Sequence, residues 1–150
     1  MIRKAVIRDA RDIHRMLVGY ARDGLMLPRS LAEIYENIRD FYVYEEEGDV
    51  LGTVSLAICW EDLAEVRSLA VSAEAGGRGI GRLLVQSCLD EATELGLQRV
   101  FALTYEPAFF AKLGFSEIEK SELPHKIWTD CLKCPKFPDC DEIAMSIDLS

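Results

Sequence analysis

The chain has 150 residues, of which 49% are hydrophobic and 29% charged, a length and balance typical of one folded domain. Its formal net charge of −9 argues against duplex nucleic acid and anionic membranes as partners, because both require clustered Lys and Arg. The N-terminus has no apolar secretory stretch, and no segment approaches about 18 continuous apolar residues. We expect a single cytoplasmic domain over residues 1–150 that acts on a small molecule.

The first third of the sequence predicts one strand and two helices. A β-rich run covers residues 2–8, and apolar residues at helical spacing follow Asp9, a candidate helix cap. Ser30 and Glu33 form a capping box that opens a second helix, which extends to about Asp40.

The next segment has the pattern of a β-hairpin. Two β-rich runs, at 41–46 and 50–60, flank a turn at 47–49, and a third run at 64–71 is expected to pair beside them. The second half then alternates between helices and strands.

That second half begins with helical spacing at 80–95, which is followed by a strand at 98–104. A short helix is expected at 107–114, with proline in its first turn and glycine at its end, and strands are expected at 115–118 and 142–149. Early hairpins followed by such units indicate a mixed sheet flanked by helices.

The most informative motif is the glycine-rich loop at 76–81, which lies between a strand and a helix. It leaves the first helical N–H groups unpaired, and the helix dipole makes them attractive to phosphate. Glycines let phosphate approach the backbone, while Arg78 and Arg82 add charge. A sharp turn with no ligand is the alternative. A Walker loop is excluded because no Lys-Ser or Lys-Thr follows, and the spacing does not fit a dinucleotide fingerprint.

In this context the chain resembles the GCN5-related N-acetyltransferase family, whose loop reads [Gln/Arg]-x-x-Gly-x-[Gly/Ala] after a strand such as 65–71. Gly76 departs from that first position. The family's second signature, an aromatic pair before Lys-Leu-Gly-Phe, matches 109–115, so the resemblance covers about residues 41–118. It implies an α/β (α+β) fold, with a mixed, mostly antiparallel sheet of about six to seven strands and about four helices, and acetyl-CoA as cosubstrate.

The resemblance also implies where coenzyme A binds. Backbone N–H groups at the end of the strand, freed by a bulge, would hold the pantetheine arm and thioester oxygen. Strict alternation would place Glu65, Arg67 and Leu69 on one face and Ser68 on the other, a parity that a bulge changes. The expected cofactor contacts are Leu69, Ala70, Val71, Gly76, Gly77, Arg78, Gly79, Ile80, Gly81, Arg82, Phe109 and Phe110.

Acetyl transfer to an amine needs a base, because free amines are largely protonated at neutral pH. Glu65 is our first choice, and a salt-bridge role at the rim is the alternative. The tyrosine with which many family members protonate the leaving sulfur is replaced by Phe110. Tyr105 is a candidate substitute, although a thiol can also leave as a thiolate.

A finer resemblance, at 27–30, 64–71 and 123–131, is to the short, single-domain N-acetylglutamate synthases of arginine biosynthesis. Glutamate carries two carboxylates and an amine, so its pocket needs two cations and a base. Arg29 and Lys126, with Arg67 as a third candidate, would supply the cations, and Ser68 would hydrogen-bond the substrate. Each cation alone could also be a solvated surface charge.

The cysteines do not indicate a disulfide framework. Cys59 and Cys88 lie in apolar patterns and are expected to be buried. The segment 131–140 contains a C-x-x-C pair and a third cysteine, which His125 or Asp141 could complete as a zinc site. Without a second pair the signal is weak, so we assign no metal.

The leading hypothesis is an acetyl-CoA:L-glutamate N-acetyltransferase. Within this class, the rivals are acetylation of another small amine or of a protein N-terminus. Outside it, the chain could be a non-catalytic acetyl-CoA sensor or a metal-binding interaction module. The sequence leaves a homodimer open.

Overall fold

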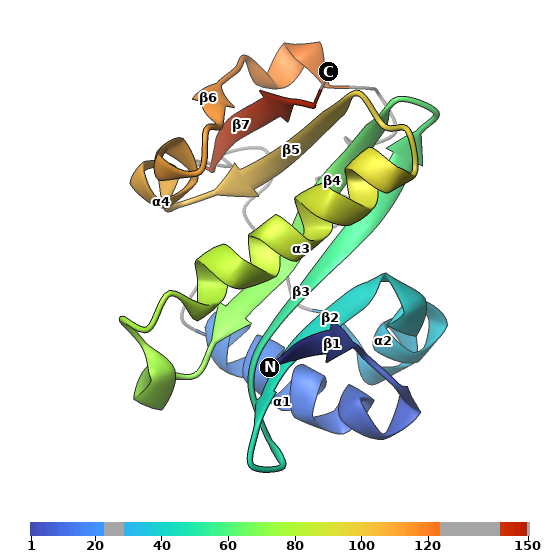
Figure 1. Ribbon diagram of the computed structural model, residues 1–150, viewed down its shortest axis with the longest axis vertical. Helices are drawn as coiled ribbons and strands as arrows, with labels where there is room; N and C mark the ends of the chain where they lie inside the picture. Colours follow the sequence, from blue (N-terminus) through green and yellow to red (C-terminus); the bar gives the residue numbers. More distant parts are fainter. Residues whose placement is uncertain (23–28, 124–141, 150) are drawn as a thin grey trace.

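The structure, a computed structural model, describes residues 1–22, 29–123 and 142–149. Within them a seven-stranded sheet has the order β1-β2-β3-β4-β5-β7-β6, and β4–β5 is its parallel pair (Figure 1). The strands are β1 (Ile2–Lys4), β2 (Phe41–Glu46), β3 (Asp49–Trp60), β4 (Leu63–Val71), β5 (Arg99–Thr104), β6 (Ser116–Glu117) and β7 (Ile143–Asp148). The helices are α1 (Ala10–Arg22), α2 (Leu31–Glu36), α3 (Ile80–Glu94) and α4 (Pro107–Lys112). This architecture confirms the fold class expected from the sequence.

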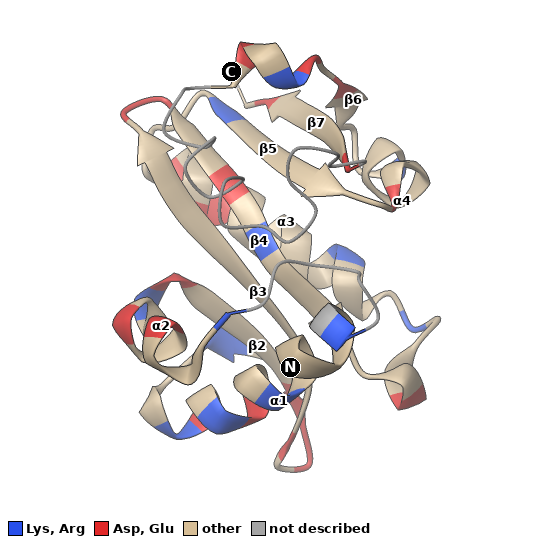
Figure 2. Cartoon of the chain, turned by 180° about the vertical axis from the view of Figure 1, so that it is seen from behind, with Lys and Arg blue, Asp and Glu red and all other residues tan. Residues whose placement is uncertain are grey.

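The two faces of the sheet are covered by different helices. One core cluster joins α3 to Val54 and Leu56 of β3 and Val66 of β4. A second cluster joins α1 and α2 to β2 and to Ala70 of β4. Figure 2 views the sheet from the side of α1 and α2. None of the helices described is long and apolar enough to cross a membrane.

The first strand is shorter than expected, and Asp9 has a different role from the predicted cap. β1 ends at Lys4, and a 3-10 turn over Ile7–Asp9 precedes α1. The carboxylate of Asp9 accepts the Val6 N–H at 2.8 Å and forms two hydrogen bonds with Arg3, at 2.7 and 3.0 Å. The residues before α1 are thereby fastened to the edge of the sheet.

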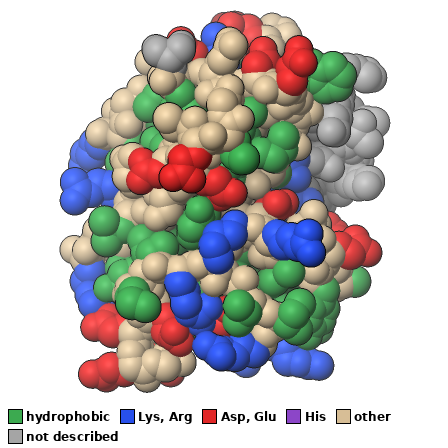
Figure 3. All heavy atoms as spheres, turned by 45° about the vertical axis from the view of Figure 1, so that its right-hand side comes forward, with side chains coloured by type: hydrophobic (Ala, Val, Ile, Leu, Met, Phe, Trp, Pro, Cys, Tyr) green, Lys and Arg blue, Asp and Glu red, His purple; other side chains and the backbone are tan. Residues whose placement is uncertain are grey.

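Ion pairs of this kind recur at the edge of the sheet. Arg3 also bonds Glu45 of β2 at 3.0 Å, and Nζ of Lys4 lies 3.6 Å from a carboxylate oxygen of Glu91 on α3. Figure 3 shows basic and acidic side chains side by side on this surface, with Lys and Arg gathered in its lower part, at the level of the N-terminal elements. The negative net charge is therefore unevenly distributed.

The other elements largely follow the sequence. The Ser30–Glu33 capping box opens α2, which ends at Glu36 and gives way to a 3-10 turn over Ile38–Asp40. The predicted third strand forms β4, while the strand expected at 115–118 shrinks to the two residues of β6. The hairpin is confirmed.

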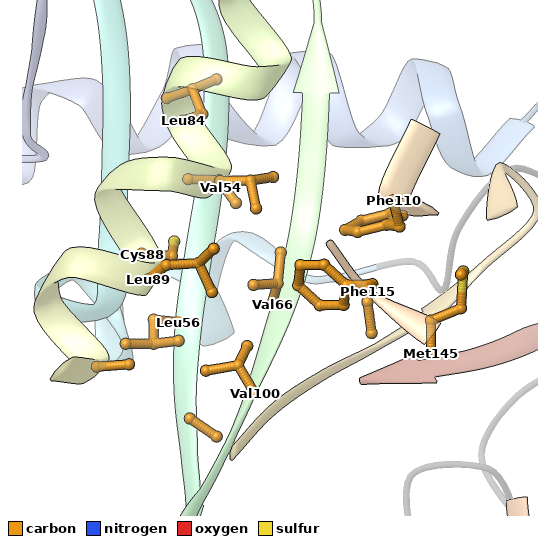
Figure 4. Packing of buried hydrophobic residues seen from close by; sticks show 14 of the residues in the cluster. Val54, Leu56, Val66, Leu84, Cys88, Leu89, Val100, Phe110, Phe115 and Met145 are labelled. Carbon is orange, nitrogen blue, oxygen red and sulfur yellow. The ribbon is translucent and has the colours of Figure 1, made fainter. Parts of the chain in front are cut away.

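α3 lies close against β3 because Gly52 has no side chain. A Cβ built on Gly52 would lie 2.9 Å from Leu84 Cδ1 and 3.0 Å from Ile80 Cγ2, too close for either side chain. Figure 4 shows the same helix packed on Val54, Leu56 and Val66. This contact fixes where α3 begins relative to the end of β4.

Candidate active site

The site is built around a fork between β4 and β5. The two strands pair only from Leu63 to Glu65 on β4, after which β5 continues with β7 and β4 continues with β3 (Figure 1). The end of β4 therefore has an edge that β5 does not cover, and Glu65 is the last residue before the opening.

A β-bulge at Ser68 shapes this edge. Ser68 has a φ of 56°, a left-handed value that costs a non-glycine residue on the order of 1–3 kcal/mol. The β3–β4 register shifts between Thr53 and Ser55, so that Ser68 and Leu69 together oppose a single residue of β3. Strained residues of this kind cluster at functional sites, and this one stands beside the fork.

The bulge overturns the parity expected from strict alternation. Leu69 packs against the cluster under α3, whereas alternation placed it with Glu65 and Arg67. Glu65 shares the opposite face with Leu63, because successive side chains alternate between them. Ser68 is half-buried, and its hydroxyl makes no hydrogen bond within the described residues.

Glu65 and Arg67 form an ion pair beside the fork. Nε of Arg67 lies 2.5 Å from Oε1 of Glu65, and the glutamate is only 7% exposed. Glu65 is thus a buried residue of the central strand and not a rim charge. The guanidinium of Arg67 thus pairs with this side chain, and a carboxylate is the form that can accept a proton. Figure 2 shows the acidic and basic positions of β4 from this side.

The glycine loop delivers the chain from β4 into α3. Gly77 and Gly79 have φ values of 81° and 77°, which favour glycine, and Gly79 is the residue before the helix. The N–H of Leu83 is the first to form a helical hydrogen bond, which it donates to the Gly79 carbonyl. The N–H groups of Ile80, Gly81 and Arg82 therefore have no acceptor within the helix. The loop has the conformation expected of an anion site.

The two arginines of the loop differ in their partners. Nη2 of Arg78 lies 2.6 Å from Oε2 of Glu46 on β2, and this hydrogen bond raises the pKa of Arg78 above its ordinary value. Arg82, in the first turn of α3, is exposed and has no ion pair within the described residues. An anion at the loop would compete with Glu46 for Arg78.

Replacing Glu46 with glutamine should therefore strengthen the binding of coenzyme A, the ligand that the sequence resemblance leads us to expect. Loss of the competing carboxylate frees Arg78, and we expect the dissociation constant to fall about two- to threefold at low salt and less at high salt. Isothermal titration at two ionic strengths measures this change. The control is Glu74→Gln, which removes one negative charge from the exposed turn preceding the loop. An equal gain in both variants would show that overall charge, and not Arg78, is responsible.

The two aromatic residues of α4 lie in different surroundings. Phe110 is buried, and its ring meets those of Phe109 and Phe115 edge to face, with 5.1 Å between centroids in each case. Figure 4 shows Phe110 beside Phe115. Phe109 packs on the first turn of α3, where a Cβ on Gly81 would lie 3.3 Å from its ring. Phe109 thus connects α4, the helix that follows β5 in the chain, to α3, the helix that follows β4.

The remaining predicted residues lie nearby or outside the described chain. Tyr105 is half-buried just after β5. Arg29 is half-buried before α2, with Nη1 3.5 Å from Glu33, and α2 covers the same face of the sheet as Glu65. Lys126 and the zinc candidates His125, Cys131, Cys134, Cys140 and Asp141 fall outside the described residues. Cys59 and Cys88 are buried as expected, and burial raises the pKa of Cys88 to about 12.

One residue at the fork was not identified from the sequence. In the sequence, Tyr20 occupies an apolar position of the first predicted helix. In the structure, its hydroxyl donates a hydrogen bond to the Val71 carbonyl at 3.0 Å and accepts one from the Val71 N–H at 3.1 Å. The available signal is general: a buried tyrosine hydroxyl usually finds a partner. Which strand supplies that partner depends on the tertiary fold.

These features place the chain in a known class. Residues 8–115 match the acetyltransferase (GNAT) family, and the chain belongs to that family. It is an N-acetyltransferase with acetyl-CoA as cosubstrate, as the sequence led us to expect.

Two proteins of known sequence are similar to this chain over most of its length. The chain is 48% identical to an uncharacterized N-acetyltransferase of Chlorobaculum tepidum, over 96% of this chain and 93% of the relative. It is 36% identical to an amino-acid acetyltransferase of Mycobacterium tuberculosis, over 87% and 76% respectively.

Two solved structures are also similar. The structure of Rv2747 from Mycobacterium tuberculosis, in complex with CoA and NLQ, has a TM-score of 0.86 and 31% identity and covers 100% of this chain and 99% of its own. N-acetylglutamate synthase from Neisseria gonorrhoeae, complexed with coenzyme A and N-acetyl-glutamate, has a TM-score of 0.91 and 27% identity. This chain spans 35% of the Neisseria chain.

Proposed function

We propose that this protein transfers the acetyl group of acetyl-CoA to the amino group of L-glutamate, as an N-acetylglutamate synthase serving arginine biosynthesis in the cytoplasm. The similarity to amino-acid acetyltransferases and to a synthase complexed with N-acetyl-glutamate supports this acceptor. The observation that carries the proposal is the buried Glu65–Arg67 pair at the fork, because it offers a carboxylate base and a carboxylate-binding cation side by side.

The cofactor lies in the opening between β4 and β5. Its pyrophosphate is held by the N–H groups at the start of α3, with Arg82 and, after release from Glu46, Arg78 adding charge. Hydrogen bonding of Ser72 to Leu51 turns the N–H groups of Val71 and Leu69 away from β3, because they alternate along the strand. Leu69 and Val71 therefore bind the pantetheine arm and thioester oxygen, while Ala70 faces β3.

Glutamate binds on the face of β4 that carries Glu65. Arg67 takes one substrate carboxylate, and Arg29 and Lys126 take the other, since guanidinium and ammonium groups pair well with carboxylates. Binding of a substrate carboxylate draws the guanidinium of Arg67 toward the substrate, while the carboxylate of Glu65 accepts the proton. Ser68 lies on the bulge between the cofactor site and the glutamate site, and its hydroxyl donates a hydrogen bond to the substrate.

Transfer is direct, within a ternary complex. Glu65 removes a proton from the ammonium group, directly or through water, and the resulting amine attacks the thioester carbon. The Leu69 N–H stabilises the oxyanion, and collapse of the intermediate breaks the C–S bond. Phe110 has no hydroxyl to protonate the sulfur, so the thiolate leaves as such, and the remaining extra proton on the nitrogen passes to it, through Tyr105 or water, to give the neutral amide and the free thiol.

A panel of acceptors tests the proposal. The protein is incubated with acetyl-CoA and, separately, with amino acids, polyamines and a peptide with a free N-terminus, and thiol release is followed. We expect release with glutamate to exceed that with every other acceptor. Release with another acceptor and none with glutamate would refute the glutamate assignment. Cofactor binding with no release for any acceptor would instead favour a sensor.

A further inference from the structure

The end of β4 offers the cofactor one backbone position that another part of the protein already holds. Val71 pairs with Gly52 in the register of β3, and the adjacent Ser72 donates to Leu51 at 2.8 Å. In an antiparallel ladder the backbone N–H and C=O groups of successive residues point alternately toward the partner strand and away from it. The N–H and C=O of Val71 therefore point to the edge that β5 does not cover.

Tyr20 takes both of these groups. Its hydroxyl lies 3.0 Å from the carbonyl oxygen and 3.1 Å from the nitrogen of Val71, donating to the first and accepting from the second. Tyr20 belongs to α1, 51 residues away in the sequence, and its ring packs against the cluster between α1 and the sheet. Only its hydroxyl reaches the edge of β4 that β5 does not cover.

We propose that Tyr20 sets the affinity for the cofactor as an internal competitor for Val71. A backbone N–H donates one good hydrogen bond, so the carbonyl of a pantetheine amide can accept it only when the tyrosine hydroxyl moves away. Each binding event breaks the two hydrogen bonds between the tyrosine hydroxyl and Val71 in exchange for those that the pantetheine amide makes, so the net gain from that contact is small. This inference rests on the proposed location of the pantetheine arm along β4.

The competition acts only on the pantetheine arm. The pyrophosphate and adenosine end meet the glycine loop, which begins at Gly76 and is separated from Val71 by a 3-10 turn over Ala73–Ala75. Loss of the Tyr20 hydroxyl should therefore improve the binding of ligands that contain the arm. Ligands that lack it should be unaffected.

Tyr20→Phe tests this, because it keeps the packed ring and removes the hydroxyl. Isothermal titration with coenzyme A is expected to show binding about two- to tenfold tighter than in the wild type, the range of one net hydrogen bond. Adenosine 3′,5′-bisphosphate, which has no pantetheine arm, should bind both proteins equally. Tyr20→Leu should reproduce the gain if the missing hydroxyl is its cause. The matched control is Tyr35→Phe on α2, because Tyr35 is 37% exposed and its hydroxyl has no hydrogen bond within the described residues.

Other results overturn the proposal. Unchanged or weaker coenzyme A binding in Tyr20→Phe would show that the hydroxyl does not compete. An equal change for coenzyme A and for the bisphosphate would indicate an effect through the glycine loop. If wild-type protein binds coenzyme A and transfers acetyl groups but Tyr20→Phe gives these results, only the role of Tyr20 fails. If the wild type does not bind coenzyme A, the proposed function itself fails.

Discussion

Replacing Glu65 with glutamine is expected to lower kcat about a hundredfold or more while cofactor affinity stays within about twofold of the wild type. Glutamine keeps the size of the side chain and a hydrogen-bonding oxygen for Arg67, but it cannot accept the proton of the substrate ammonium group. Because the proposed cofactor contacts are backbone groups farther along β4 and the glycine loop, the dissociation constant of the cofactor should not follow kcat. Steady-state kinetics and isothermal titration measure the two quantities.

The control for this experiment is Glu61→Gln, an exposed residue in the turn between β3 and β4. It makes the same chemical change close to the same strand, and we expect its kcat to match that of the wild type. A Glu65→Gln enzyme with unchanged turnover would remove Glu65 from the role of base. Equal losses of turnover and of cofactor binding would indicate a structural role.

Asp9→Asn should produce the largest loss of stability among the variants considered, about 2–3 kcal/mol at neutral pH. Asp9 is 3% exposed and accepts two hydrogen bonds from Arg3 and one from the Val6 N–H. Asparagine keeps one acceptor but leaves the half-buried guanidinium with only part of its negative environment. Glu45, which also bonds Arg3, limits the loss. Urea unfolding gives the free energy.

The effect should depend on pH in a definite direction. The hydrogen bonds from Arg3 hold the pKa of Asp9 below its ordinary value of 3.8. A carboxyl group with a lowered pKa in the folded state stabilises the fold above its ordinary pKa, and this contribution disappears as the pH falls through the folded value. The difference between the wild type and Asp9→Asn should be constant near neutrality and shrink below pH 3.8.

Asp12→Asn provides the matched control. Asp12 also pairs with an arginine, Arg15, at 3.0 Å, but its side chain is 45% exposed and that of Arg15 is 76% exposed. Exposed pairs contribute little because water screens them, so the expected loss is under about 0.5 kcal/mol. Equal losses for Asp9→Asn and Asp12→Asn would contradict the importance of burial.

Local signals in the sequence were reliable where the structure depends on neighbouring residues. The Ser30–Glu33 box, the hairpin turn and the glycine loop each formed as expected, because capping and turn conformations involve residues a few positions apart. Strand ends were less accurate. The first strand stops at Lys4 because Asp9 satisfies the Val6 N–H, which the local pattern of apolar residues does not reveal.

The sequence by itself determined the family and the cosubstrate, because these follow from motifs with a defined chemistry. Only the tertiary structure decided which groups meet. The bulge at Ser68 turns Leu69 to the other face of the sheet. The carboxylate of Glu46 accepts a hydrogen bond from Arg78, and the hydroxyl of Tyr20 accepts one from the Val71 N–H. Each of these contacts joins residues brought together by strand register or helix packing, and register and packing depend on the whole core. The glycine loop could therefore be predicted from the sequence, while the contacts of Glu46 with Arg78 and of Tyr20 with Val71 could not.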